Sequence, residues 1–238
     1  MDRFEMTPRA EFETPLAIGA ERVTAFLRKV YGWMFAGLGI TAAVAFVVAG
    51  SPTLIRTILG NPILFIAMIV AELGLVVALS ARVDRMAART AAILFVTYSA
   101  LNGVLFSAIL LTFTGASIAT TFLVTAGMFG ALALYGTATR RSLAGVGQFV
   151  FMGLIGLVIA IVVGFFWKAP ALQFVISVVG VLVFTGLTAW DAQRLKAMAA
   201  VTPDDRIAGR SIVGALALYL DFVNLFLFLL RFLGARRD

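Results

Sequence analysis

Long apolar stretches fill the chain from about residue 30 to about residue 232, and short polar connections separate them. An α-helix needs about 20 apolar residues to cross the hydrocarbon core of a bilayer. Strands of a membrane barrel would instead alternate apolar and polar residues over about ten positions. The pattern therefore predicts an all-α polytopic membrane protein with seven transmembrane helices. The predicted spans are residues 30–50, 62–81, 90–113, 117–139, 146–167, 171–190 and 212–230.

The connections between these spans are short and carry turn-forming residues, as in the Ser-Pro pair at 51–52. Short connections force neighbouring helices to run antiparallel. The longest connection, residues 192–211, contains Thr-Pro-Asp-Asp at 202–205, which predicts a turn that caps a short helical piece and leaves its carboxylates in solvent. We expect one membrane domain at 30–232, an N-terminal tail at 1–29 and a C-terminal tail at 233–238.

Composition agrees with this prediction and narrows the chemistry. The 238 residues are 62% hydrophobic and 13% charged, whereas soluble domains carry about 45–50% apolar and about 25% charged residues. Cysteine is absent, which excludes disulfides, thiolate metal sites and cysteine nucleophiles. Histidine is also absent, so proton sensing near neutral pH must come from carboxylates. No phosphate-binding glycine loop is visible, and we expect neither an enzyme nor an organic cofactor.

The basic residues predict the topology. The net charge of +7 arises from Lys and Arg in short connections rather than on one basic stripe, so we expect the lipid bilayer and no nucleic acid as a partner. Of the 19 Lys and Arg residues, 14 fall on the side of the N-terminal tail, which predicts a cytoplasmic N-terminus. The tail has no signal-peptide core, and the compact loops favour a bacterial plasma (inner) membrane.

Arginines near the C-terminus depart from the rule that Lys and Arg lie mainly on the cytoplasmic side. Arg231, Arg236 and Arg237 belong to the five basic residues on the side opposite to the N-terminal tail. If the last apolar segment were re-entrant instead of spanning, the split of basic residues would become 17 to two. We keep seven spans, which places these arginines outside.

Three acidic residues lie within predicted spans or at their ends, where an ionised carboxylate costs roughly 2.5–3.5 kcal/mol. Glu72 lies mid-way through the second span, Asp191 follows the sixth and Asp221 lies near the middle of the seventh. Because the sixth and seventh spans are consecutive and antiparallel, we expect Asp191 and Asp221 to meet. Two carboxyls in a poorly solvated site cannot both ionise cheaply, so they titrate as a unit that shares a proton.

The deprotonated pair would offer clustered oxygen ligands of the kind that Ca²⁺ prefers. We therefore expect Asp191 and Asp221 to bind Ca²⁺ in competition with protons. A full Ca²⁺ shell needs about six to eight oxygens, so carbonyls or waters must supply the rest. The alternative is that each carboxyl stays protonated and hydrogen-bonds a neighbouring helix.

Four further polar residues are candidates for supporting roles. Asn224 follows Asp221 by three residues on the same helical face, where it would orient the aspartate, complete a ligand set or hydrogen-bond another helix. Glu72 is expected to line the same cavity or to pair with a basic residue. Arg82 and Arg85 end the second span, where an arginine can clamp an aspartate and close a pore. Anchoring at the cytoplasmic surface is the alternative interpretation of both arginines.

The contexts of the two aspartates are specific enough to suggest a family. The first is Thr-Gly-Leu-Thr-Ala-Trp-Asp-Ala-Gln-Arg-Leu-Lys at 185–196, and the second is Tyr-Leu-Asp-Phe-Val-Asn-Leu-Phe at 219–226. Together they resemble the Bax inhibitor-1 family of seven-span membrane proteins, as a bacterial member, and the resemblance extends from Arg28 onward.

The resemblance implies a central seventh helix enclosed by the other six, and a pH-sensitive Ca²⁺ leak with a di-aspartyl sensor on the last two helices. Asp191 and Asp221 match the sensor positions. It also implies an arginine latch at the end of the second span, which maps onto Arg82 or Arg85. We therefore expect a calcium leak channel in which protonation of the aspartate pair gates cation flux.

Two alternatives stay open. Some bacterial relatives in that family are linked to inhibition of a membrane-anchored protease, so the chain could be an interaction protein that modulates such a protease. An intramembrane aspartyl protease also needs two facing aspartates. However, Tyr219 and Leu220 stand where those proteases typically carry a Gly-x-Gly-Asp context, which disfavours this alternative.

Overall fold

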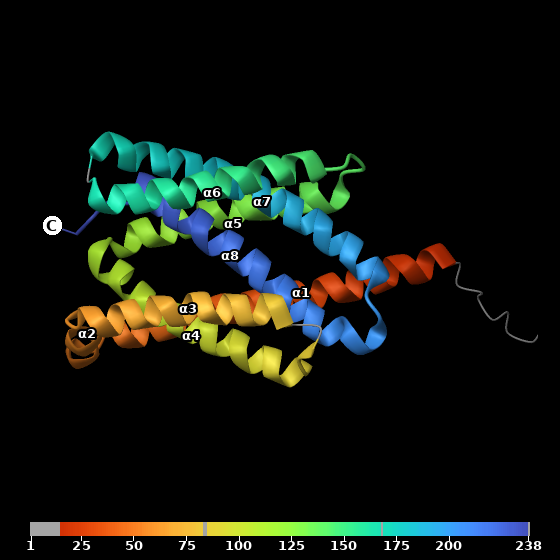
Figure 1. The fold of residues 1–238 in the computed structure, drawn as a ribbon, viewed down its shortest axis with the longest axis horizontal. Coiled ribbons are helices and arrows are strands. Elements are labelled where there is room, and N and C mark those ends of the chain that lie inside the picture. The colour runs from red at the N-terminus through yellow and green to blue at the C-terminus, as the bar shows by residue number, and fades with distance from the viewer. Residues whose placement is uncertain (1–14, 83–84, 168, 238) are drawn as a thin grey trace, which may run out of the picture.

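A computed structural model describes residues 15–82, 85–167 and 169–237 of the chain. Over these residues the fold is helical, and its only strand-like feature is one isolated bridge between Phe113 and Arg236. The helices form a bundle whose long members run roughly along one axis (Figure 1). The elements are α1 (Pro15–Ala49), α2 (Pro52–Leu59), α3 (Pro62–Arg82), α4 (Ala88–Thr112), α5 (Gly115–Ala138), α6 (Ala144–Phe166), α7 (Pro170–Val201), the 3₁₀ helix η2 (Asp204–Arg206) and α8 (Ile207–Leu233).

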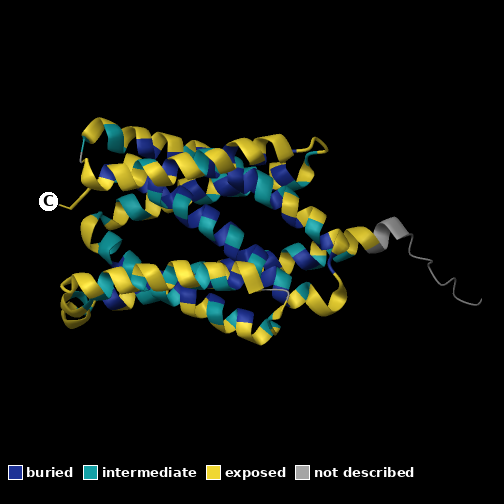
Figure 2. Cartoon of the chain, in the orientation of Figure 1, coloured by how far each residue is buried: buried dark blue, intermediate teal, exposed yellow. Residues whose placement is uncertain are grey.

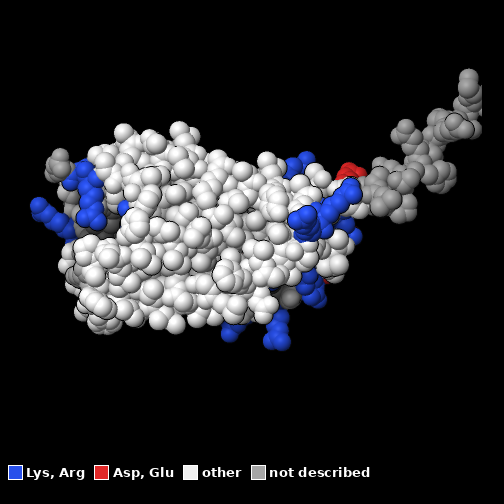
Figure 3. Space-filling model, turned by 90° about the horizontal axis from the view of Figure 1, so that it is seen from above, with Lys and Arg blue, Asp and Glu red and all other residues white. Residues whose placement is uncertain are grey.

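Seven helices in the described part of the chain are long and apolar enough to cross a membrane, which confirms the predicted seven-span, all-α fold. On the face drawn in Figure 3, Lys and Arg lie at the two ends, and an uncharged band separates them. The chain enters at one end and leaves at the other (Figure 1), so α8 spans the bundle and is not re-entrant. We call these the N-terminal end and the C-terminal end of the bundle.

The short helix α2 lies between the first two predicted spans, where the sequence predicts only a connection. Ser51 caps it through a hydrogen bond from Leu54 N to Ser51 Oγ, and Pro52 occupies its first turn. Both are standard signals for the start of a helix. At eight residues, α2 is too short to span a bilayer, so it changes no topology.

The helix α7 runs beyond its predicted end at residue 190. It continues to Val201, because residues 192–201 are mostly good helix formers and Leu195 and Ala199 pack into the core. The turn predicted at 202–205 does end it, and η2 follows at once. The predicted solvation of Asp204 and Asp205 is also confirmed, with side chains 86% and 77% exposed.

The last helix, α8, forms the centre of the bundle, as the resemblance implied. It contacts α1, α4, α5 and α7, and most of its residues are buried. Figure 2 shows the buried residues concentrated along it, while the outer helices are exposed on their outward faces. Aromatic side chains fill the contacts: Phe222 meets Phe129 edge to face, and Tyr219 does the same with Phe95 and Tyr98.

Glycines let α7 approach its neighbours closely just before Asp191. A Cβ atom on Gly136 of α5 would overlap the backbone carbonyl of Ala189. A Cβ on Gly147 of α6 would overlap the Trp190 ring. Small residues at helix crossings allow this kind of backbone approach in membrane bundles. The two glycines therefore fix where this turn of α7 sits.

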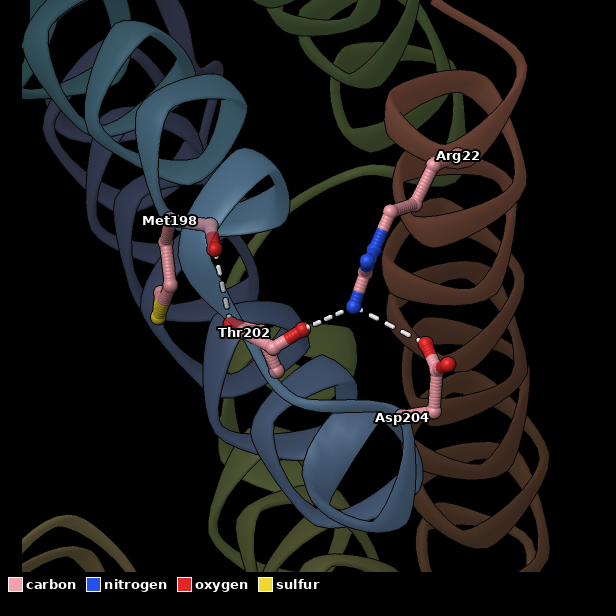
Figure 4. Close-up of polar contacts among 4 residues, drawn as sticks. All are labelled: Arg22, Met198, Thr202 and Asp204. Carbon is pink, nitrogen blue, oxygen red and sulfur yellow. Dashed lines mark hydrogen bonds and ion pairs between the residues drawn. The ribbon is translucent and has the colours of Figure 1, made fainter. Parts of the chain in front are cut away.

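A contact from α1 holds the link between α7 and α8 (Figure 4). Arg22 Nη2 donates a hydrogen bond to the carbonyl oxygen of Thr202 and lies 2.8 Å from Asp204 Oδ1. Thr202 is fully buried, and its hydroxyl donates back to the carbonyl of Met198. The N-terminal part of α1 thus braces the link that joins the two aspartate-bearing helices.

Candidate functional site

The structure brings Asp191 of α7 and Asp221 of α8 together. Both line one groove, and their carboxyl groups are close enough to hydrogen-bond one another. Asp221 is 4% exposed, and its Oδ2 has no hydrogen-bond partner among the described residues. The Asp191 side chain is 14% exposed and lies on the more open side. The site is therefore a carboxyl pair with one buried member and one that faces the groove.

The groove has a volume of about 630 Å³ and is bounded by α3, α6, α7 and α8. The half-buried stripe of α8, at Val213, Ala217, Leu220 and Asn224, forms its floor. The polar side chains of the groove and its one tryptophan lie around the aspartates and toward the N-terminal end of the bundle. In the other direction, α6 and α8 contribute an apolar lining. That lining includes Leu154, Leu157, Val158, Ile161 and Phe228.

Among the described residues, Arg194 is the cation beside the aspartate pair, and the sequence pattern predicted no role for it. Its Nη1 lies 3.9 Å from Asp191 Oδ1, one helical turn away on α7. Its guanidinium also lies over the Trp190 ring, with Cζ 5.5 Å from the ring centroid. The spacing of three residues was visible in the sequence and could have suggested this pair.

Asn224 lies in the groove beside Asp221, as expected from their spacing. Its Nδ2 donates a hydrogen bond of 2.8 Å to the carbonyl of Leu220, one turn back on α8. This bond uses the amide nitrogen within the helix itself. The amide oxygen is then the atom that Asn224 can offer to a ligand in the groove.

Neither candidate latch arginine reaches the aspartates in this conformation. Arg82 is the last residue of α3 and Arg85 follows it, and both side chains are exposed. Neither lines the groove, where α3 contributes Ser80 instead. Neither arginine forms an ion pair with an acidic residue in the described part of the chain. The latch role of Arg82 or Arg85 stays a prediction.

Glu72 lies outside the groove, so the expectation that it lines the same cavity is not met. It faces a separate polar cluster, close enough to Tyr98 and Tyr219 for electrostatic interaction. Its Oε1 is buried and lacks a hydrogen-bond partner among the described residues. No basic residue among these pairs with it either. Its support role stays a prediction.

The second polar cluster joins α1, α4 and α8 in the middle of the bundle. The Thr41 hydroxyl lies 2.6 Å from the Tyr219 hydroxyl, and Thr41 also donates to the carbonyl of Ser99. Asn102 donates to the Tyr98 hydroxyl at 3.0 Å, one turn away on the same helix. These contacts satisfy polar groups buried between helices and so contribute to packing.

The groove brings together groups that can exchange a proton or hold a cation. Across the described residues, no three His, Cys, Asp or Glu side chains form a metal-binding group. The described lining carries the carboxyls of Asp191 and Asp221, the Asn224 amide and the Arg194 guanidinium, together with the Ser80 hydroxyl and the Trp190 indole. Such a set can exchange a proton or a cation.

Comparisons with known proteins identify relatives over most of the chain. A family model described as inhibitor of apoptosis-promoting Bax1 matches residues 23–238. The inner membrane protein YbhL of Escherichia coli strain K12 is 45% identical over 240 residues, which covers 100% of both chains. A protein of Borreliella burgdorferi is 44% identical over 215 residues, 90% of this chain and 93% of that one. A protein of Rickettsia prowazekii is 41% identical over 223 residues, 92% of each chain.

Proposed function

The chain belongs to the Bax inhibitor-1 family of integral membrane proteins, and from that premise we propose that it is a pH-sensitive calcium leak channel. The observation that carries the proposal is the meeting of Asp191 and Asp221 in one groove between α7 and α8. Membrane-embedded carboxyls are costly and mark ion or proton pathways more often than packing sites. In this proposal, protonation of the pair controls cation flux.

A shared proton is the physical basis of the pH sensitivity. Asp221 is buried, and Asp191 lies within hydrogen-bonding reach of it. Two such carboxyls repel each other when both are ionised, so they hold one proton between them and titrate as a unit. Loss of that proton leaves a doubly negative site that attracts a divalent cation.

Calcium would reach this site as cargo and not as a resident cofactor. The pair offers four carboxylate oxygens, Asn224 adds its amide oxygen, and water in the groove would complete the shell of about six to eight. Arg194 is a built-in competitor, because its guanidinium already lies beside Asp191. A cation must displace it before binding both carboxylates.

The apolar stretch beyond the aspartates supports a gated path. From Asp221 toward Phe228 and Ile161 the groove is lined by hydrocarbon, over which a hydrated ion would lose its water without replacement ligands. Conduction therefore requires the helices around α8 to separate. Protonation, cation binding and release of Arg194 would shift the balance between closed and open arrangements.

The proposed location is the bacterial inner membrane with a cytoplasmic N-terminus. The inner-membrane name belongs to the relative YbhL, and the orientation rests on the excess of Lys and Arg at the N-terminal end. The aspartates would then face the cytoplasm through the polar side of the groove. Protons and calcium ions inside the cell would be the ligands that compete for the pair.

The test is Ca²⁺ flux into liposomes that contain the purified full-length chain, measured across external and internal pH. Wild type should show a flux that changes with pH. Asp191→Asn and Asp221→Asn should each abolish that dependence, because a single carboxyl has no partner with which to share a proton. Asp205→Asn is the matched control, since this carboxylate is 77% exposed and lies outside the groove.

Wild-type pH dependence in both groove variants would refute the leak proposal. It would favour the alternative of an interaction protein that modulates a membrane-anchored protease. That alternative invokes the N-terminal tail, whose residues 1–14 lie outside the described structure, or the cytoplasmic connections. Cleavage of membrane-spanning peptides, dependent on both aspartates, would instead indicate an intramembrane aspartyl protease.

A further inference from the structure

A second cavity lies at the C-terminal end of the bundle, where it shares Ile161 with the apolar end of the aspartate groove. It has a volume of about 960 Å³ and is formed by the end of α6, the start of α7, the last turn of α8 and Arg236, which follows α8. Most of its walls are apolar, whereas Arg231 and Arg236 line it with guanidinium groups. The apolar walls include Ile161, Phe165, Pro170, Phe174, Ile176 and Phe232.

Backbone hydrogen bonds fix the position of Arg236. The chain after α8 runs antiparallel to the α4–α5 connection, with Thr114 N donating to Ala235 O at 3.1 Å and Arg237 N donating to Thr112 O at 3.0 Å. Ala235 N also donates to Ser117 Oγ at 2.7 Å. These three hydrogen bonds are made by the residues on either side of Arg236, and they hold Arg236 at the cavity.

Arg231 approaches the same cavity from the last turn of α8. Its Cζ lies 6.0 Å from the centroid of the Phe228 ring, so the side chain lies along an aromatic wall. No acidic residue in the described ranges pairs with Arg231 or Arg236. The two positive charges therefore lack a protein counterion within the part of the chain that the structure describes.

The start of α7 adds a third feature that favours an anion. Pro170 occupies its first turn, and no described side chain caps this end. The backbone N–H groups of a helix start carry partial positive charge and attract anions. Pro170 lines the cavity beside the arginines, so the positive end of α7 and both guanidinium groups face one space.

We propose that this cavity binds an anionic phospholipid, with the phosphate held by Arg231 and Arg236 and an acyl chain along the apolar wall. Guanidinium groups bind phosphate oxygens through charge-assisted hydrogen bonds. An apolar wall next to paired cations matches a molecule that carries hydrocarbon and phosphate together, and a free phosphate would leave that wall uncovered. The site is separate from the aspartate pair and does not depend on the leak proposal.

The proposal also explains the charge distribution at this end of the bundle. The positive-inside rule leaves the arginines after α8 on the disfavoured side of the membrane. A lipid phosphate neutralises them there without any acidic side chain. These arginines would thus anchor the end of the central helix to the bilayer, with the tail bridge between Phe113 and Arg236 as the support.

The test measures lipid adducts of the full-length protein by native mass spectrometry in a neutral detergent. The probes are phosphatidylglycerol and phosphatidylcholine with the same acyl chains. Wild type should retain phosphatidylglycerol about tenfold more strongly, and the Arg231→Gln/Arg236→Gln double variant should lose that preference. Arg56→Gln is the matched control, because it removes an exposed arginine at the same end of the bundle outside the cavity.

Further measurements in the same assay distinguish a lipid phosphate from a free phosphate. Inorganic phosphate and glycerol phosphate should fail to displace the lipid, and Phe174→Ala should weaken long-chain phosphatidylglycerol more than the short-chain form. Equal retention of both lipids, unchanged retention in the double variant, displacement by inorganic phosphate, or a dimer in place of the lipid adduct would each overturn the proposal. Thermal unfolding of every variant in detergent alone should match wild type. If the double variant unfolds early, the single Arg231→Gln and Arg236→Gln variants replace it, and each should weaken the preference.

Discussion

Arg194 lies beside Asp191 on the same helix, with its Nη1 3.9 Å from Asp191 Oδ1. The guanidinium also covers the ring of Trp190, which packs on Gly147 of α6. The arginine side chain is 64% exposed and the aspartate side chain only 14%, so the arginine stands on the open side of the pair. An incoming cation meets the guanidinium before it meets the carboxylates.

Replacing Arg194 by glutamine should therefore strengthen cation binding. The change removes a competing positive charge but keeps a polar side chain of similar length. Because a largely exposed ion pair contributes about 0.2–1 kcal/mol, we expect the Ca²⁺ concentration for half-maximal flux to fall by a factor of roughly 1.4 to 5. Liposome flux against Ca²⁺ concentration at fixed pH measures this shift.

The control for that measurement is Arg140→Gln, which removes an exposed arginine from the α5–α6 connection at the same end of the bundle. It should leave the Ca²⁺ dependence unchanged. An equal shift in both variants would mean that overall surface charge, rather than contact with Asp191, controls cation access.

Asp221→Asn should stabilise the fold while it removes the proposed function. Once the shared proton has left, the buried Asp221 Oδ2 has no donor beside it, whereas an asparagine amide at this position can donate to the Asp191 carboxylate. One such hydrogen bond contributes about 1 kcal/mol, which raises the melting temperature of a chain of this size by about 2–4 °C. Thermal unfolding in detergent measures this rise in melting temperature, and the control variant Asp205→Asn should melt at the same temperature as wild type. A lower melting temperature for Asp221→Asn would show that the buried carboxyl stabilises the native state.

The seven spans and the approach of the two aspartates were predictable, because both depend on features that are local in the sequence. Span length follows from runs of apolar residues. The approach of Asp191 and Asp221 follows from two consecutive antiparallel helices, each of which carries one aspartate. The turn at 202–205 places the link between them within a few residues of its true position.

The orientation of Glu72 was not predictable, because α3 is apolar on almost every face. In a membrane, lipid-facing positions are as hydrophobic as buried ones, so the sequence does not reveal how a helix is rotated about its axis. Glu72 does not line the groove and lies close enough to Tyr98 and Tyr219 for electrostatic interaction. The contact of Arg194 with the aspartate pair was not predictable for the same reason. It depends on which side of α7 faces the groove, and the sequence does not reveal that.

Gly136→Ala should destabilise the bundle by about 1–3 kcal/mol, because the new methyl group would overlap the carbonyl of Ala189, a backbone atom that cannot rotate away. Gly127→Ala is the matched control in the same helix, since a Cβ there meets nothing within 4 Å. We expect that change to be neutral or stabilising by up to about 1 kcal/mol. Melting temperatures of both variants decide the matter, and similar values would show that the α5–α7 crossing can adjust.

Arg22 should stabilise the fold more through its hydrogen bond to Thr202 than through its ion pair with Asp204. Its hydrogen bond satisfies a carbonyl at the end of α7 in a fully buried residue, so Arg22→Ala should cost about 1–3 kcal/mol. Its ion pair is with a carboxylate that is 86% exposed, so Asp204→Asn should cost at most about 1 kcal/mol. Salt distinguishes the two contributions, because it screens the exposed ion pair but not the bond to the buried carbonyl. In high salt, Asp204→Asn should melt with wild type while Arg22→Ala still melts lower; if both variants converge on wild type, the ion pair alone accounts for the brace between α1 and the α7–α8 link.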